Sequence, residues 1–191
     1  MQIAPVWARE SERKKESAGD KVLVNGSSGA VGIFVFHIAK MFGAEVTAVD
    51  TTAKLEQIRA MGADHVIDFT AEDFTRNCQA YNLIIEVGGF HSVYDHQRVL
   101  APGGKCSYVG GSAPLILQVV TVGTILGKMT GKKIGILGLQ TNKDLAFFGG
   151  VMTAGKVTPI IDKVFSLAET AQAFRHYEFG AFIGKIVISV R

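Results

Sequence analysis

Cysteine is scarce in this chain, with only Cys78 and Cys106 among 191 residues. The two lie far apart and form no Cys-x-x-Cys pair, so a zinc site built on cysteines is not expected. The first residues lack the basic segment and apolar run that are typical of a signal peptide. These absences favour a reducing, cytoplasmic setting.

The chain also lacks a strong charge bias and a long hydrophobic run. Its formal net charge is +3, which is too weak and too dispersed to predict nucleic-acid binding. The one basic cluster, Arg9, Arg13, Lys14 and Lys15, is interrupted by glutamates and is typical of a solvated helix face. The longest apolar stretch, residues 115–126, contains polar residues and is too short to span a bilayer, so no membrane partner is expected.

Glycine, by contrast, is abundant, with 22 residues. The most informative glycines lie in residues 26–32, Gly-Ser-Ser-Gly-Ala-Val-Gly, between an apolar run at 21–25 and a predicted helix at 33–40. Small residues allow the backbone to approach a pyrophosphate, and free N–H groups at a helix N-terminus favour its charge. Ser28, Gly29, Ala30, Val31 and Gly32 are therefore predicted to bind a dinucleotide.

Strands and helices alternate through the following residues. Further strands are predicted at residues 45–49, 65–68, 82–86, 105–109 and 133–139, with helices at 54–61 and 93–100 and a turn at 101–104. Near-continuous apolar strands separated by helices predict an α/β fold, a doubly wound parallel six-stranded sheet with helices on both faces. Ligands bind such sheets at the carboxyl ends of the strands, where 26–32, Asp50, 88–89 and 110–111 lie.

The C-terminal part has a different pattern: a helix at 143–154, a strand at 160–165, a helix at 168–179 and a strand at 185–190. We therefore predict three regions. Residues 1–18 form an irregular or helical lead-in, 19–155 a dinucleotide-binding Rossmann domain, and 156–191 a C-terminal segment.

Asp50 lies 18 positions after Gly32, at the end of the second predicted strand. A carboxylate there accepts hydrogen bonds from an adenosine ribose, although Asp50 also suits the N-cap of the next helix. If Asp50 faces the ribose, NAD is favoured. If it turns away and Thr51, Thr52 and Lys54 face the 2′-phosphate, NADP is favoured, and the sequence leaves both open. Lys54 is equally compatible with a solvated helix position.

Other nucleotide-binding families fit less well. The loop lacks the lysine of a P-loop, none of the four tyrosines has a lysine four residues on, and Asn25 stands where methyltransferases usually carry an acidic residue. The five histidines have no evident carboxylate or cysteine cluster around them and are interpreted as structural or surface residues. No metal site is expected, and no catalytic residue is identified, since a cofactor can carry the hydride chemistry.

Several longer segments, residues 19–32, 62–68, 100–104, 155–162 and 184–188, carry a family resemblance. The chain resembles the cofactor half of the medium-chain dehydrogenase/reductase superfamily, and most of all its zinc-free quinone oxidoreductase (zeta-crystallin-like) branch. The resemblance implies hydride transfer from NADPH, less often NADH, to a quinone or an α,β-unsaturated carbonyl. It carries family cofactor contacts over to Ser28, Ala30, Val31, Thr51, Lys54, Val87, Gly88 and Gly110.

The resemblance covers only part of a typical family member. Family members carry an N-terminal GroES-like catalytic domain, whereas only residues 1–18 precede the matching region. We therefore expect little turnover by this chain alone, and a dinucleotide-binding module or truncated sensor is the alternative function. The final strand, 185–190, is expected to lack its usual partner. Its edge and that of 133–139 predict a homo-oligomer, such as a dimer.

Overall fold

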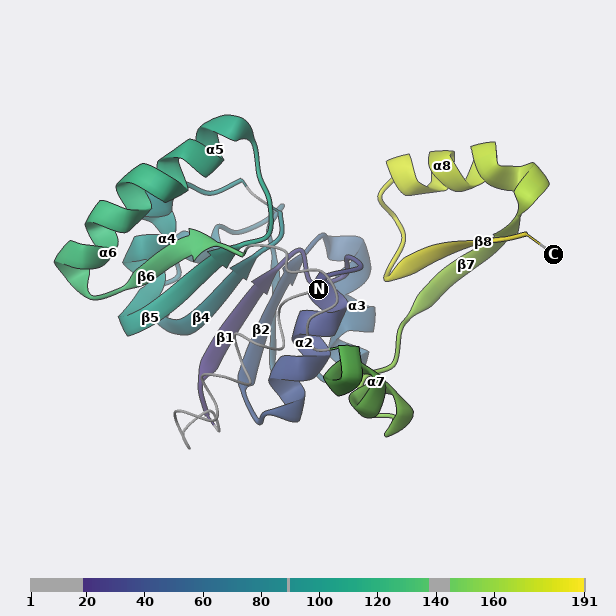
Figure 1. Cartoon of the computed structure of the whole chain (residues 1–191), viewed down its shortest axis with the longest axis horizontal. Helices are drawn as coiled ribbons and strands as arrows, with labels where there is room; N and C mark the ends of the chain where they lie inside the picture. Colours follow the sequence, from purple (N-terminus) through teal and green to yellow (C-terminus); the bar gives the residue numbers. More distant parts are fainter. Residues whose placement is uncertain (1–18, 89, 138–144, 191) are drawn as a thin grey trace.

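The computed structural model describes residues 19–88, 90–137 and 145–190. The predicted lead-in, residues 1–18, lies outside the described residues, as do Gly89 and 138–144. The main body is a six-stranded parallel sheet in the order β3-β2-β1-β4-β5-β6. This order and the flanking helices confirm the predicted doubly wound α/β fold (Figure 1).

The strands of the main sheet are β1 (Lys21–Asn25), β2 (Glu45–Asp50), β3 (His65–Asp68), β4 (Tyr81–Glu86), β5 (Leu100–Tyr108) and β6 (Lys133–Ile136). The helices of this half are α2 (Gly32–Met41), α3 (Thr52–Ala60), η1 (Phe74–Arg76), α4 (Val93–Val99), α5 (Ala113–Gln118), η2 (Val119–Gly123) and α6 (Thr124–Thr130). All six predicted strands are present, and β6 ends earlier than predicted.

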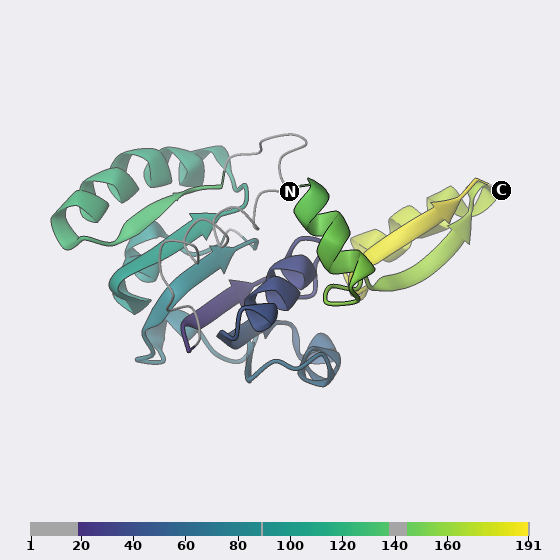
Figure 2. The ribbon, with the colours of Figure 1, turned by 60° about the horizontal axis from the view of Figure 1, so that its bottom comes forward.

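Alternating residues of the strands build a core on each face of the sheet. Val22 and Val24 pack with α2 and with Val151 of α7 (Leu145–Thr153), whereas Leu23 belongs to the opposite cluster, with Val93 of α4. Figure 2 shows α2 and α7 together on one side of the sheet. Burial on both faces explains why these strands are almost entirely apolar.

Two predictions about the second half of this sheet are corrected. The turn predicted at 101–104 lies inside β5. The register between β4 and β5 shifts after Leu100, because the glycines allow the strand to form a bulge and then continue. The apolar stretch at 115–126 belongs to a continuous helix, Ala113–Thr130, which is long and apolar enough to cross a membrane and has only 11% of its residues buried. Gly123 sits close to Ile134 of β6, so this helix packs on the sheet.

The C-terminal residues form a separate two-stranded parallel sheet of β7 (Ile161–Ser166) and β8 (Lys185–Ser189). The helix α8 (Thr170–Glu178), preceded by η3 (Leu167–Glu169), connects them. Both views place this unit beside the main sheet rather than in it (Figures 1 and 2). The final strand is expected to lack its usual partner and to present an open edge; among the described residues it pairs along one edge, with β7.

Candidate functional site

The glycine loop joins β1 to α2 in a conformation that requires glycine. Gly26 has a φ of +80°, and a Cβ on Gly32 would lie only 2.1 Å from the carbonyl oxygen of Gly26. The amide of Gly29 donates back to the same oxygen at 3.3 Å. The chain therefore folds tightly over itself here and presents its backbone at the carboxyl end of the sheet.

The N-terminus of α2 is open. Its N-cap is Val31, which provides no side-chain cap, and its first turn has no acidic residue. Within the described residues, the N–H groups of Ala30, Val31 and Gly32 have no hydrogen-bond acceptor. Unpaired donors at the positive end of a helix bind an anion such as a pyrophosphate. The geometry thus fits the dinucleotide predicted for this loop.

Asp50 faces the glycine loop. Its Oδ2 accepts from the N–H of Ser28 at 2.8 Å and its Oδ1 accepts from the N–H of Thr51 at 3.0 Å. The residue is only 5% exposed. The N-cap interpretation is wrong, because Thr51 holds that position. Each carboxylate oxygen of Asp50 thus accepts one backbone hydrogen bond, from Ser28 of the loop and from Thr51.

Lys54 also points into the loop. Its Nζ donates to the Ser28 hydroxyl at 3.1 Å and lies 3.8 Å from Asp50 Oδ1, and its side chain is 13% exposed. The solvated-helix alternative for Lys54 is therefore wrong. Thr52 does not join it, because its hydroxyl donates to Asp68. A single positive charge thus stands beside the loop, close to a buried carboxylate.

The ends of β4 and β5 complete this edge of the sheet. The N–H of Val87 donates to Asn25 O at 3.0 Å, and a Cβ on Gly26 would lie 3.3 Å from Val87 Cβ, so the two loops touch. A pocket of about 450 Å³ opens here, lined by residues of the first, third and fourth strand ends: Asn25, Gly26, Phe69, Glu72, Asp73, Gly88, Phe90 and His91. Gly110 follows β5 with a φ of +84°.

The C-terminal unit reaches the same loop. The N–H of Gly184 donates to Ser28 O at 2.8 Å, and the Phe182 ring lies 5.5 Å from Lys54 Nζ. A Cβ on Gly184 would meet Ile160 O at 2.3 Å, so only glycine fits this crossing. Segments far apart in the sequence thus meet at Ser28.

Below this edge lies a buried polar group that sequence reasoning missed. His96 Nε2 is 2.8 Å from Glu86 Oε2, and its Nδ1 is 2.6 Å from the Tyr108 hydroxyl. The expectation that no carboxylate or cysteine cluster surrounds the histidines is therefore wrong for His96 and for its neighbour His91. His65 and His176 each pair with a single carboxylate. A glutamate that ends an apolar strand, followed by two histidines, is the signal that could have revealed it. Burial raises the pKa of Tyr108 well above its usual range, so the phenol stays protonated.

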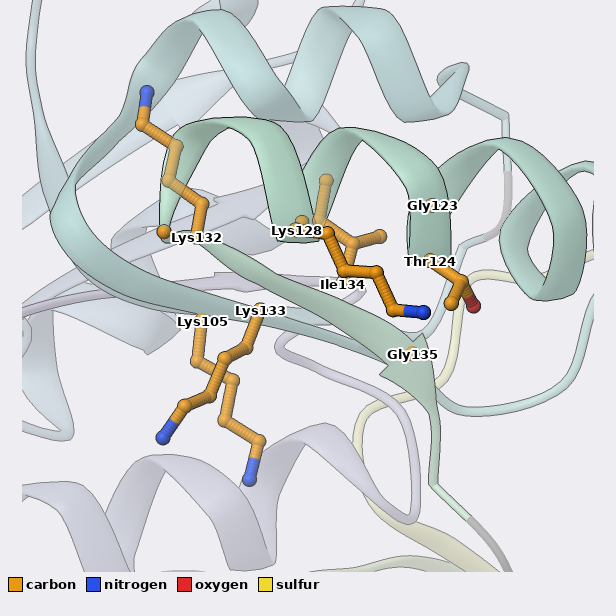
Figure 3. Close-up of a pocket in the computed structure, with 10 residues that line it drawn as sticks. Lys105, Gly123, Thr124, Lys128, Lys132, Lys133, Ile134 and Gly135 are labelled. Atoms are coloured by element: carbon orange, nitrogen blue, oxygen red, sulfur yellow. The ribbon is translucent and has the colours of Figure 1, made fainter.

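A second pocket of about 450 Å³ lies between α6 and β6 and carries the lysines Lys105, Lys128, Lys132 and Lys133. In Figure 3 the side chains of Lys105 and Lys133 extend in one direction, whereas Lys128 and Lys132 extend elsewhere. Lys132 Nζ donates to Gln97 O at 2.7 Å. These charges do not converge on one point, so the pocket lacks the geometry of an anion site.

Sequence comparisons place the chain in a known family. The family described as zinc-binding dehydrogenase matches residues 61–188. The mouse (Mus musculus) protein "NAD(P)H oxidoreductase RTN4IP1, mitochondrial" is 30% identical over 196 residues, which cover 92% of this chain and 49% of that protein. The Arabidopsis thaliana "NADPH-dependent alkenal/one oxidoreductase, chloroplastic" is 30% identical and covers 92% of this chain and 42% of that protein.

Solved structures show the same fold. A quinone oxidoreductase from Coxiella burnetii superposes with a TM-score of 0.78 at 23% identity, over 99% of this chain and 58% of that one. An alcohol dehydrogenase from Pyrobaculum aerophilum gives a TM-score of 0.73 at 24% identity, over 94% and 52% of the two chains. This chain spans about half the length of the curated relatives it matches. It therefore belongs to the zinc-binding dehydrogenase family of the medium-chain dehydrogenase/reductase superfamily and covers the C-terminal domain of its members.

Proposed function

We propose that this chain is the cofactor-binding part of an NAD(P)H-dependent oxidoreductase that reduces a quinone or an α,β-unsaturated carbonyl. The open N-terminus of α2 above the glycine loop is the observation that carries this proposal. The nicotinamide supplies the hydride. The chain's own residues bind and orient: Ala30, Val31 and Gly32 offer N–H groups to the pyrophosphate, while Val87, Gly88 and Gly110 flank the cleft.

The cofactor that this geometry favours is NADPH. Asp50 is engaged by two backbone N–H groups, and Lys54 leaves a positive charge at the edge of the loop. A 2′-phosphate gains from that cation, whereas a ribose diol would need a more exposed carboxylate. We propose that Thr51 lies beside the same phosphate.

Titration calorimetry of the full chain with NADPH and NADH tests both proposals. We expect NADPH to bind about tenfold more tightly, and Lys54→Ala to remove that preference at a cost of about 1.4 kcal/mol. Lys128→Ala, an exposed lysine of the second pocket, is the matched control and should leave both affinities unchanged. Failure of both nucleotides to bind would overturn the proposed function, and tighter NADH binding would overturn only the cofactor choice.

A dinucleotide-binding module without independent turnover is the second candidate. We propose three regions, 1–18, 19–155 and 156–191, with 156–191 packing on a further domain in relatives. NADPH oxidation with a quinone at about 1 per second or faster would contradict this candidate.

We also propose a cytoplasmic homo-oligomer with no membrane or nucleic-acid partner and with zinc-independent hydride transfer. The outer edge of β6 has no strand partner among the described residues, and Leu117, Val120, Ile125 and Met129 of the adjoining helix are exposed. These features support pairing of two copies. The free thiols Cys78 and Cys106 suit a reducing compartment. A monomer detected by light scattering at high protein concentration would contradict the proposed oligomer.

A further inference from the structure

Three side chains from the end of β4, the next loop and α4 gather beneath the cofactor cleft. Glu86, His91 and His96 each offer one ligand atom, and these atoms all lie within 4.8 Å of one another. The side chains of Glu86 and His96 are completely buried, and that of His91 is 23% exposed. His91 also lines the pocket at this edge, which gives an ion a path from solvent.

Glu86 and His96 are held in position by outer partners. Asn25 Nδ2 donates to Glu86 Oε1 at 2.7 Å, leaving Oε2 toward His96. On the far side of the His96 ring, Nδ1 lies 3.2 Å from Ser92 O and 2.6 Å from the Tyr108 hydroxyl. A proton on Nδ1 leaves Nε2 as the atom that can bind a metal. Such outer hydrogen bonds orient the ligands of metal sites.

His91 follows the same arrangement. Its Nε2 is 3.3 Å from Asp73 Oδ1, the geometry of a carboxylate that orients a metal-bound histidine. Its Nδ1 is buried and has no hydrogen-bond partner among the described residues. A buried ion pair between Glu86 and His96 would account for those two residues but would leave this nitrogen unsatisfied.

We propose that Glu86 Oε2, His91 Nδ1 and His96 Nε2 bind a divalent zinc ion, with water in the fourth position. Two imidazoles and one carboxylate are a ligand set that zinc accepts. The ion replaces the proton that Glu86 and His96 otherwise share, so that proton is released to solvent. The proposed site departs from the expectation that this chain has no metal site.

A bound ion would hold two elements against the sheet, the loop after β4 and the helix α4. Asn25 lies opposite Glu86 in the register of β1 and β4, so an ion on Glu86 also steadies the end of β1. Both loops line the cofactor pocket. Zinc should therefore raise the melting temperature whether or not a dinucleotide binds, and the proposal does not depend on the proposed function.

The test starts from the whole 191-residue chain treated with a chelator. Titration with ZnCl₂ is followed by calorimetry and by metal analysis after gel filtration, and Co²⁺ serves as the spectroscopic probe. We expect one bound ion per chain, visible absorption bands of four-coordinate cobalt, and a rise in Tm of about 5 °C at a hundredfold excess over Kd. Affinity should fall as the pH is lowered, because protons compete for the histidines.

Single-residue variants test which side chains bind the zinc ion. His91→Ala removes a partly exposed ligand and should abolish stoichiometric binding while leaving the metal-free Tm close to that of the parent. His176→Ala is the matched control, since His176 Nε2 also pairs with a carboxylate, Asp162, at 2.6 Å but outside this cluster. Glu86→Gln keeps the side-chain size and provides a second loss variant. Substoichiometric zinc, or binding that survives both His91→Ala and Glu86→Gln, would overturn the proposal.

Discussion

The main sheet and the C-terminal unit of this protein are built from similar strands but bury them very differently. In β1, Val22, Leu23 and Val24 are completely buried, whereas in β7 only Phe165 is buried. In α8 the one buried residue is Ala173, and Phe174, Tyr177 and Phe179 nearby are more than half exposed. The main sheet has helices on both faces, so it carries its own core. The C-terminal unit presents an apolar surface of the kind that another chain or domain covers.

The largest effect on the stability of the main sheet is expected at the glycine loop. Gly32→Ala places a Cβ 2.1 Å from Gly26 O and should destabilise the protein by about 4 kcal/mol, with loss of dinucleotide binding. Gly149→Ala in α7 is the control, since its Cβ would meet nothing within 4 Å and should stabilise by about 0.5 kcal/mol. Urea unfolding measures both, and equal effects would show that the loop is not constrained.

A matched pair of leucines tests the difference in burial directly. Leu23→Ala in β1 should cost about 3 kcal/mol, because the side chain is fully buried in a close-packed core. Leu167→Ala should cost less than about 0.5 kcal/mol, because Leu167 is 61% exposed. The same urea titration serves for both. A large cost at Leu167 would show that this side chain is buried in solution and would contradict the difference in burial.

The rate at which the buried thiol of Cys106 reacts measures opening of the main sheet and not opening of the C-terminal unit. Burial raises its pKa well above the usual range, so it should react with a thiol reagent only when the sheet opens. In a Cys78→Ser background, Ala173→Asp should disrupt α8 yet change the Cys106 rate by less than about twofold. Leu23→Ala should raise that rate about a hundredfold. A large rise with Ala173→Asp would mean that the two units unfold together.

The smallest expected effect concerns two capping boxes, Ser92 with Asp95 in α4 and Ser166 with Glu169 in η3. Burial raises the pKa of Asp95, but hydrogen bonds from Ser92 and the charge of Arg98 outweigh it, so the net shift is downward. Hydrogen bonds from Ser166 lower the pKa of Glu169.

Each carboxylate therefore stabilises the fold above its ordinary pKa, and the stabilisation is lost as pH falls through its lowered folded-state pKa. Asp95→Asn and Glu169→Gln should lower the free energy of unfolding at about pH 7, and the difference from the parent should vanish at about pH 2. NMR titration of the parent checks the two pKa directions. A difference that persists at low pH would show that the substitutions act through packing instead.

Much of the fold could be predicted because it depends on local pattern. The apolar run before Gly26, for example, requires a buried strand followed by a tight turn, and the structure confirms both. The helix Ala113–Thr130 was not predicted, since an apolar stretch with scattered threonines has no clear period. The bulge in β5 was missed because Pro102 and Gly103 are typical of a turn that ends a strand.

Neighbouring residues alone specify the alternation of strands and helices, the glycine loop and the placement of Asp50 at a strand end. The direction of the Asp50 side chain depends on long-range packing, because its partner Ser28 belongs to a different loop. The same holds for Glu86 and His96, which meet because a helix returns over the end of β4. Side-chain partners of this kind come from segments that only folding brings together, and no local pattern encodes their distances.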